Sequence, residues 1–331
     1  MQIVFLGTGS STPTEDRWLP SVLLNVKGEY LLLDCGEGAQ YRVLTAGLKV
    51  NKLAAILVTH MHGDHLYGLP GLLESLEVWG KKEPLRVFGP SGIDEYLNAA
   101  LARKELVYTV TAEGVAPGLV MARPGYRVYA VHVDHGVEAY AYIVVEDDYP
   151  GKFNEVKAKE LGIPPGPLRR KLLLGEPVTL PDGRVVEPRE VVGPSRRGLK
   201  VVYSGDTRPC DDLIQAAKGA DLLIHEATFS SDLEEEAKLS FHSTASGAAK
   251  AASQACAKLL VLTHFSGRCR SVSPLLEEAR RVFRRSYAAK DMLKVELKRW
   301  GKSWLVAQFE LLGIRRCGHL FDRHALNSSR S

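Results

Sequence analysis

The chain of 331 residues lacks any long hydrophobic run. A membrane-spanning helix needs roughly 18 or more consecutive apolar residues, so we expect no membrane association. The first residues, Met-Gln-Ile-Val-Phe-Leu-Gly, enter an apolar stretch without a basic region or a cleavage site, which argues against a secretion signal. The cysteines are scattered, odd in number and without a Cys-x-x-Cys pair: Cys35, Cys210, Cys256, Cys269 and Cys317. This pattern excludes a disulfide framework and favours a reducing cytoplasm.

Asparagine and glutamine are also scarce, with five of each. Depletion of these thermolabile residues hints at a thermophilic source. Otherwise the composition, with 45% hydrophobic and 25% charged residues, is that of an ordinary globular protein. The length allows one large domain or two small ones.

The net charge of +4 is unevenly distributed. Residues 152–200 carry 11 basic and 6 acidic side chains, and residues 279–331 carry 13 and 4, so the remainder is acidic. An acidic body suits the binding of cations, and two basic segments suit a polyanion. For residues 279–300 an equally supported alternative to polyanion binding is that the basic side chains only solvate surface helices.

The densest polar motif follows the short apolar run Leu53–Val58, which we expect to be a buried strand. Residues 59–65, Thr-His-Met-His-Gly-Asp-His, then form the loop at its end and hold three of the ten histidines. Imidazole nitrogens and carboxylate oxygens are the ligands of Zn²⁺ and similar borderline ions. The motif therefore predicts a metal site, and a polar turn with chance histidines is the weaker interpretation.

Further candidates follow other predicted strands. His132 ends the predicted strand Tyr126–His132 and His135 follows it, and either histidine could be a ligand. Asp206 follows the strand at 200–204, where its two oxygens could bridge two metals. Asp34 either orients a metal-bound histidine or caps a helix. Two more histidines occupy comparable places: His242 precedes an alanine-rich helix at 243–257, and His264 follows a strand at 259–262.

Strands and helices alternate along most of the chain, which predicts a layered α/β fold. Helices are expected at 66–78, 92–106, 274–286 and 287–298, and a strand at 304–311. Residues 147–200 break this pattern because they are rich in proline and glycine. We expect them to form a projecting arm with a short helix near 153–161 and without a hydrophobic core of its own. A surface loop is the alternative, but loops of this length are usually functional.

The motif His-x-His-x-Asp-His resembles the signature of the metallo-β-lactamase superfamily. Residues 34–40, 204–208, 225–229, 242–245 and 262–266, together with the arm, resemble the motifs of the ribonuclease Z family in order. His135 matches a metal ligand of that family, because five residues separate it from Ala141-Tyr142, where the family has Gly-Tyr. The resemblance covers residues 1–312.

This resemblance implies an αββα sandwich with a projecting Gly-Pro-rich arm. Residues 1–312 would be one metallo-β-lactamase domain that includes the arm and linker at 147–200, and residues 313–331 a loose tail. Two divalent ions, taken to be Zn²⁺, are implied in the cleft: one held by His60, His62 and His135, the other by Asp64, His65 and His264, with Asp206 bridging. Asp64 could also accept a proton from water. His242, oriented by Glu226, would protonate the leaving oxygen.

The implied function is a zinc-dependent endoribonuclease that removes the 3′ trailer from precursor tRNA. Its products would be a 3′-hydroxyl on the tRNA and a 5′-phosphate on the trailer. The short form of the family implies a cytoplasmic homodimer. Two alternative functions remain open from the sequence. A hydrolase of small phosphodiesters would be favoured by a shortened arm, and a non-catalytic RNA-binding relative by the loss of a ligand.

Overall fold

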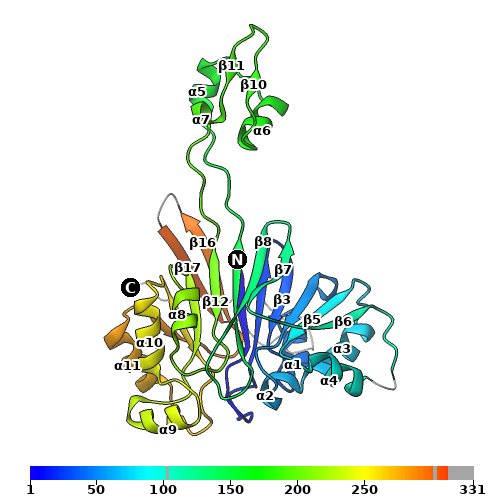
Figure 1. The fold of residues 1–331 in the computed structure, drawn as a ribbon, viewed down its shortest axis with the longest axis vertical. Helices are drawn as coiled ribbons and strands as arrows, with labels where there is room; N and C mark the ends of the chain where they lie inside the picture. The colour runs from blue at the N-terminus through cyan, green and yellow to red at the C-terminus, as the bar shows by residue number, and fades with distance from the viewer. Residues whose placement is uncertain (102–103, 301–303, 312–331) are drawn as a thin grey trace, which may run out of the picture.

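The computed structural model describes residues 1–101, 104–300 and 304–311. Two large sheets pack face to face, with helices on their outer surfaces (Figure 1). The strand order is β17-β16-β1-β2-β3-β4-β5-β6 in the first sheet and β15-β14-β13-β12-β9-β8-β7 in the second. This αββα arrangement confirms the predicted fold class. No helix in these ranges is both long enough and apolar enough to cross a bilayer.

The first sheet carries its helices on the face away from the second sheet. Its strands are β1 Gln2–Gly7, β2 Ser21–Val26, β3 Glu29–Leu33, β4 Leu53–Leu57, β5 Leu85–Gly89, β6 Val110–Gly114, β16 Leu293–Trp300 and β17 Trp304–Leu311. The covering helices are α1 Ala39–Thr45, α3 Leu69–Val78 and α4 Ile93–Ala100. The short helices η1 Val50–Lys52 and α2 Gly63–Leu66 flank β4.

The second sheet is covered in the same way by α8 Asp211–Ala216, α10 Ala245–Gln254 and α11 Ser273–Val282. Its strands are β7 Gly118–Arg123, β8 Tyr126–His132, β9 Tyr140–Glu146, β12 Lys200–Tyr203, β13 Leu222–Glu226, β14 Leu260–Thr263 and β15 Ser286–Ala288. Two short helices, η2 Ser231–Leu233 and α9 Glu234–Leu239, precede His242.

Strand β4 illustrates how the apolar runs build this core. Ala55 and Leu57 face the core between the sheets, whereas Ile56 and Val58 face the helices of the first sheet. Strands buried on both faces read as continuous hydrophobic runs rather than as alternating ones. The backbone N–H of Tyr140 donates to the carbonyl of Thr59 at 2.9 Å, so the loop after β4 lies against the start of β9 in the other sheet.

Several expected elements differ in the structure. The helix expected at 66–78 is divided into α2 and α3, and the helix expected at 92–106 ends at Ala100. The helix expected at 287–298 is wrong: this segment contains most of β15 and most of β16. Val295 and Leu297 are buried while the intervening Glu296 is less so, which is the period of two of a strand. Strand β6 was not expected.

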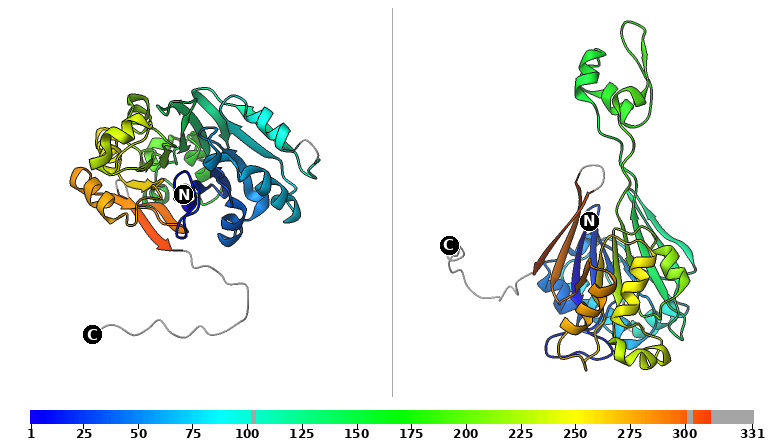
Figure 2. Two further views of the ribbon diagram at one scale, coloured as in Figure 1. Left: turned by 90° about the horizontal axis from the view of Figure 1, so that it is seen from below. Right: turned by 90° about the vertical axis from the view of Figure 1, so that its left-hand side faces the viewer.

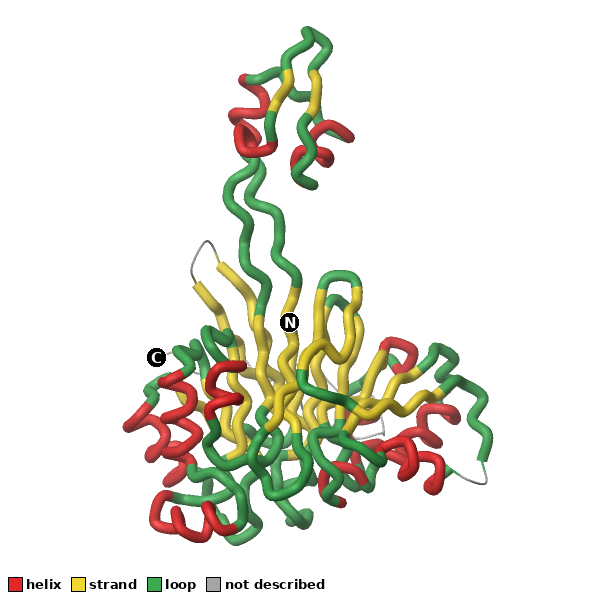
Figure 3. The backbone as a smooth tube through the Cα atoms, viewed as in Figure 1, coloured by secondary structure: helices red, strands yellow, loops and turns green. Residues whose placement is uncertain are grey.

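The predicted arm leaves the body between β9 and β12 and projects away from it (Figures 1 and 3). Its two extended segments are joined by isolated bridges between Tyr149 and Arg196 and between Phe153 and Val192. A Cβ atom on Gly151 would lie 1.8 Å from the carbonyl oxygen of Gly193, so only glycine permits this approach. We call residues 147–153 and 192–199 the stalk.

The stalk carries a small head made of α5 Glu155–Glu160, α6 Pro167–Leu173, β10 Val178–Thr179, β11 Val185–Val186 and α7 Pro188–Val191. The expectation that the arm has no hydrophobic core is wrong. A cluster of buried side chains holds the head together: Ala158, Ile163, Leu172, Val178, Leu180, Val186 and Val191. These residues are spread over elements too short to show a regular hydrophobic period, so the sequence pattern did not indicate this core. The tail predicted at 313–331 lies outside the described residues.

Candidate metal centre

The loops that follow β4, β8, β12 and β14 meet at the end of the sheets opposite the arm (Figure 2). They bring together all the residues predicted to hold metal. Donor atoms within 4.8 Å of one another are contributed by His60, His62 and His135 in one group, and by Asp64, His65 and His264 in another. Asp206 shares a third group with His60 and His65.

Asp206 lies between the first two groups. Its Oδ2 atom is 3.3 Å from Nε2 of His65 and 3.2 Å from Nε2 of His264. The same oxygen is 3.8 Å from Nε2 of His60 and also 3.8 Å from Nε2 of His135. A single carboxylate oxygen that faces both groups has the geometry of a bridging ligand.

The outer nitrogens of these imidazoles are tied to the protein. Nδ1 of His65 donates to Oδ2 of Asp34 at 2.8 Å, and Nδ1 of His135 donates to the carbonyl of Phe241 at 3.0 Å. Nδ1 of His60 lies 3.0 Å from the hydroxyl of Thr59. Such contacts fix the ring orientation and leave Nε2 free to bind a metal.

The inner nitrogens lack ordinary partners. Nε2 of His60 is buried without a hydrogen bond, and Nε2 of His65 lies 3.4 Å from Nε2 of His264. With both rings neutral, these two Nε2 atoms would turn lone pairs toward each other, and a positive charge between them, from a proton or a metal ion, removes that repulsion. The donor set therefore fits a metal ion, and a His/Asp cluster that can bind metal ions is confirmed as part of the fold.

The pKa shifts show that the buried carboxylates and imidazoles of the cluster interact strongly with one another. Burial alone would raise the pKa of Asp206, but the neighbouring His264 and His65 hold it well below its usual range. Burial lowers the pKa of His60 well below its usual value, which keeps this ring neutral. For His65 burial also lowers the pKa, but Asp206, Asp34 and Asp64 outweigh it and raise the pKa well above 6.5. Such a concentration of carboxylates attracts a cation.

Asp34 does not cap a helix, because the residue that precedes α1 is Gly38. Its side chain is fully buried and accepts four hydrogen bonds. Oδ1 accepts the Thr59 N–H at 2.7 Å, and Oδ2 accepts the Tyr203 hydroxyl at 2.8 Å in addition to His65 and the Thr59 hydroxyl. Asp34 thus joins the loop at residues 59–65 to the second sheet.

His242 and Glu226, the predicted acid and its orienting residue, are also adjacent to the cluster. Nδ1 of His242 lies 2.8 Å from Oε1 of Glu226. Burial would lower the pKa of His242, but the Glu226 carboxylate and this hydrogen bond raise it to about 9. The His242 ring is stacked on that of His264, with centroids 5.5 Å apart. Thr244, not His242, caps α10 by accepting the N–H of Gly247.

Several residues at the site were not predicted from the sequence. Thr228 donates to Glu226 at 2.8 Å and contacts Nδ1 of His264 at 2.9 Å, so it joins the two. The backbone N–H of Ser11 donates to Oδ2 of Asp64 at 2.8 Å. Thr228 lies within the motif at 225–229 that resembles the ribonuclease Z family, so the sequence could have identified it. The contact from Ser11 uses only its backbone N–H, which no residue type reveals. His132, the alternative to His135, is exposed and stacks on Tyr140 instead.

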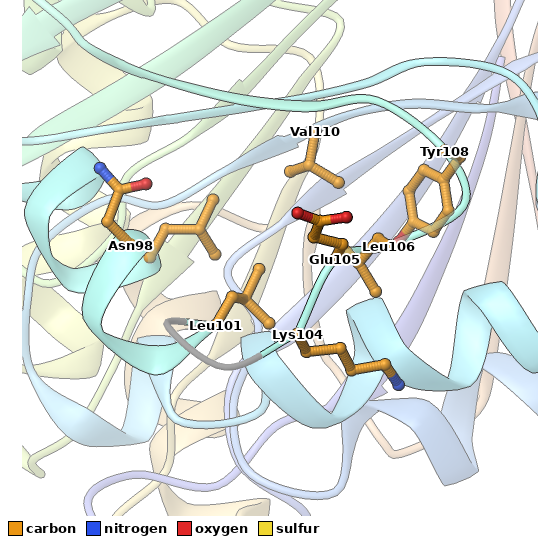
Figure 4. A pocket seen from close by; sticks show the side chains of 8 residues that line it. Asn98, Leu101, Lys104, Glu105, Leu106, Tyr108 and Val110 are labelled. Carbon is orange, nitrogen blue, oxygen red and sulfur yellow. The ribbon is translucent and has the colours of Figure 1, made fainter.

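A separate cavity of about 660 Å³ lies between α4 and β6 (Figure 4). It is lined by Leu97, Asn98, Leu101, Lys104, Glu105, Leu106, Tyr108 and Val110. None of these residues belongs to the cluster, and Lys104 is already paired with Glu74 and Glu77. The cavity thus adds nothing to the metal centre.

Two helix-covered sheets with a His/Asp cluster at one end define a protein of the metallo-β-lactamase fold. In agreement, residues 185–265 match a family model described as a beta-lactamase superfamily domain, and residues 1–106 match one described as anti-Pycsar protein Apyc1. A ribonuclease Z of Methanosarcina acetivorans is 42% identical over 300 residues, which cover 90% of this chain and 98% of that protein. The ribonuclease Z of Bacillus subtilis is 42% identical over 306 residues, covering 90% and 100%.

The same similarity is seen among solved structures. The crystal structure of human tRNase Z, short form, has a TM-score of 0.66 at 26% identity and covers 89% of this chain and 99% of that one. The chain belongs to the ribonuclease Z family. The predicted family and the predicted enzyme class, an endoribonuclease, are thereby confirmed.

The role of Asp34 can be tested by Asp34→Asn. Asparagine tolerates the left-handed backbone at this position, where φ is 57°. The neutral amide accepts the His65 N–H less strongly, so we expect Zn²⁺ affinity to fall roughly 10- to 100-fold in chelator competition. Asp221→Asn, at an equally buried acid at the opposite end of the second sheet, is the matched control. Equal metal loss in the two variants would show that burial, not orientation of His65, explains the effect.

Proposed function

We propose that this chain removes the 3′ trailer from precursor tRNA, leaving a 3′-hydroxyl on the tRNA and a 5′-phosphate on the trailer. The observation that carries the proposal is the complete donor cluster beside the His242–Glu226 pair in a chain 42% identical to ribonuclease Z proteins. A non-catalytic RNA-binding relative would have lost one of these donors. The cysteines Cys35, Cys210, Cys256 and Cys269 are unpaired, which supports activity in the cytoplasm.

We further propose that the cluster holds two ions, with His60, His62 and His135 on one side and Asp64, His65 and His264 on the other. Asp206 would bridge them. Imidazole and carboxylate donors favour Zn²⁺ among the common divalent ions. When bound, a metal pair supplies an activated water and neutralises the charge that develops on the phosphoryl oxygens.

The protein's own residues would move the protons. Asp64 is held by the N–H of Ser11, and its partly accessible carboxylate would accept the proton of the attacking water. His242 would donate a proton to the leaving 3′-oxygen. A raised pKa of about 9 keeps His242 protonated at neutral pH, as an acid must be. Glu226 orients His242 through the contact between its Oε1 atom and Nδ1.

The arm would bind the substrate of a second subunit. β9 begins near His135 and ends at the stalk, and β12 returns from the stalk toward Asp206, so the strands separate the arm from the cluster. β9 has 7 residues, which corresponds to about 20 Å, and the head points further away (Figure 1). An arm in this position serves an active site most directly in a partner. We therefore propose a homodimer of chains whose domain spans residues 1–312, with the arm as an insertion.

Exposed apolar side chains on α1 and just after α2 support such a partner. Tyr41 and Leu44 lie three residues apart on α1, and their exposed fractions are 62% and 61%. Tyr67, just after α2, is 64% exposed. Large apolar side chains exposed together often mark a protein–protein contact.

The reaction itself is tested with a 3′-extended tRNA transcript and analysis of both product ends. We expect cleavage that a chelator abolishes. His242→Ala should slow the reaction roughly 10²- to 10⁴-fold because the leaving group loses its acid, while the metal content stays unchanged.

His132→Ala serves as the control, since this histidine is exposed and lies outside the cluster. It should retain the wild-type rate. Metal loss in His242→Ala would make His242 a ligand, and a near-normal rate would remove it from the mechanism. No cleavage by the metal-loaded wild type would contradict the proposed function.

The arm can be tested by replacing its head with a short turn. The N–H of Gly193 donates to the carbonyl of Lys152 at 2.9 Å, so the stalk segments are close enough there to be joined. Hydrolysis of a small chromogenic phosphodiester should persist, because the cluster lies in the body, whereas cleavage of precursor tRNA should be severely reduced through weaker binding.

Mixing this variant with an intact-arm Asp206→Ala chain should restore part of the tRNA cleavage if the arm acts across the dimer. The Asp206→Ala chain alone provides the baseline. Loss of both activities in the arm variant, with fold and metals retained, would contradict the separation of arm and active site. Persistent tRNA cleavage would contradict the binding role.

A further inference from the structure

Six basic side chains gather at the arm end of the second sheet. They lie where its parallel strands begin: Arg197 and Lys200 at β12, Lys218 before β13, Lys258 before β14, and Arg284 and Arg285 before β15. We call these six residues the basic collar. They come from four segments of the chain, two of which belong to the basic stretches 152–200 and 279–331.

Hydrogen bonds join these segments into one surface. Nζ of Lys200 donates to the carbonyl of Lys218 at 3.2 Å, and the backbone N–H of Lys258 donates to the carbonyl of Ala220 at 2.9 Å. The backbone N–H of Leu260 then donates to the carbonyl of Arg285 at 3.0 Å. The collar therefore runs continuously from the foot of the stalk to the start of β15.

Little negative charge balances the collar. Asp221 lies beneath it with no exposed surface and accepts from Nζ of Lys258 at 2.7 Å. It also lies 3.8 Å from Arg197. At the foot of the stalk, Asp148 accepts the backbone N–H of Gly198 at 2.9 Å. Glu146, which accepts the N–H of Leu199 at 3.3 Å, is buried like Asp221. Among these three acids only Asp148 is exposed, so the six cations leave a positive surface.

A concave surface adjoins these charges. Arg197, Lys200 and Lys218 line a cavity of about 450 Å³ whose other walls include Val131, Ile143 and Val145. Basic side chains that only keep a surface hydrated need no adjoining cavity. Cations of one sign gathered around a recess concentrate their field there and attract an anion more strongly than the same charges spread over a flat surface.

We propose that the basic collar binds the sugar–phosphate backbone of the precursor tRNA. The proposal rests on the function proposed above and adds a second contact surface, distinct from the head of the arm. The stalk rises directly from Arg197, so RNA held along the arm passes close to the collar. The His/Asp cluster lies at the opposite ends of the same strands, so the collar takes no part in the chemistry.

The test uses the full chain with Lys218→Gln, Arg284→Gln and Arg285→Gln combined. These three side chains belong to exposed residues, whereas Lys258 and Arg197 are left intact because they contact the buried Asp221. Binding of precursor tRNA is measured in chelator at several salt concentrations. Each lost phosphate contact should reduce the slope of log affinity against log salt by up to about 1, so we expect a reduction of about 2 to 3.

The matched control combines Lys49→Gln, Lys52→Gln and Lys82→Gln, which removes the same charge from exposed residues beside the first sheet. Its salt slope should stay at the wild-type value. An equal reduction in both triple variants would overturn the collar, because it would reflect net charge alone. A single variant, Lys218→Glu, gives a second test: it should also lower the affinity for precursor tRNA.

Two further outcomes separate the collar from the function itself. If the wild type cleaves precursor tRNA and the collar variant shows an unchanged slope, the collar proposal is wrong and the function stands. If the wild type neither binds nor cleaves precursor tRNA, both proposals fail. Hydrolysis of a small phosphodiester at the wild-type rate by both triple variants shows that the active site is intact.

Discussion

The structure depends on the concentration of carboxylates and imidazoles at one end of the two sheets. Asp206 is almost fully buried, and its Oδ2 atom lies within 3.8 Å of Nε2 atoms from four histidines. Burying these groups costs free energy unless each is paired or binds a cation. The surrounding contacts, from Asp34, Thr228 and the carbonyl of Phe241, hold the rings so that a metal can provide that compensation.

The backbone around the cluster shows the cost of this convergence. Asp34, Phe241 and His264 adopt positive φ angles of 57°, 59° and 58°, which non-glycine residues rarely occupy. Such strained conformations persist where the surrounding structure determines them and are typical of functional sites. The sandwich supplies this rigidity, because strands buried on both faces fix the points from which the loops leave.

The same strands separate two tasks. Their ends near His135 and Asp206 form the metal centre, and their other ends lead into the stalk at Glu146 and Lys200. The proposed chemistry and the proposed RNA binding by the arm could therefore be modified independently. The stalk, narrowed by Gly151 and Gly193, carries a head that is stabilised by its own small core.

The sequence was most informative where residue types are chemically unusual. Histidines and aspartates at the ends of apolar runs predicted the cluster. The choice of His135 over His132 rested on the resemblance to the ribonuclease Z family, in which five residues separate the ligand from a Gly-Tyr pair. The sequence was least informative where a contact depends on the backbone or on distant residues. The Ser11 N–H that reaches Asp64 has no residue signature, and Tyr203 reaches Asp34 only through the packing of the two sheets. The segment 287–298 was mistaken for a helix because its many charged residues masked the alternation of β16.

The central proposal is that each chain holds two metal ions and that the carboxylate of Asp206 would contact both. Elemental analysis of protein purified without chelators tests it directly. We expect close to two divalent ions per wild-type chain, and the loss of both or nearly both in Asp206→Ala with the fold retained, because both groups of donors share that oxygen. A wild-type enzyme that is fully active with one tightly bound ion would contradict the account.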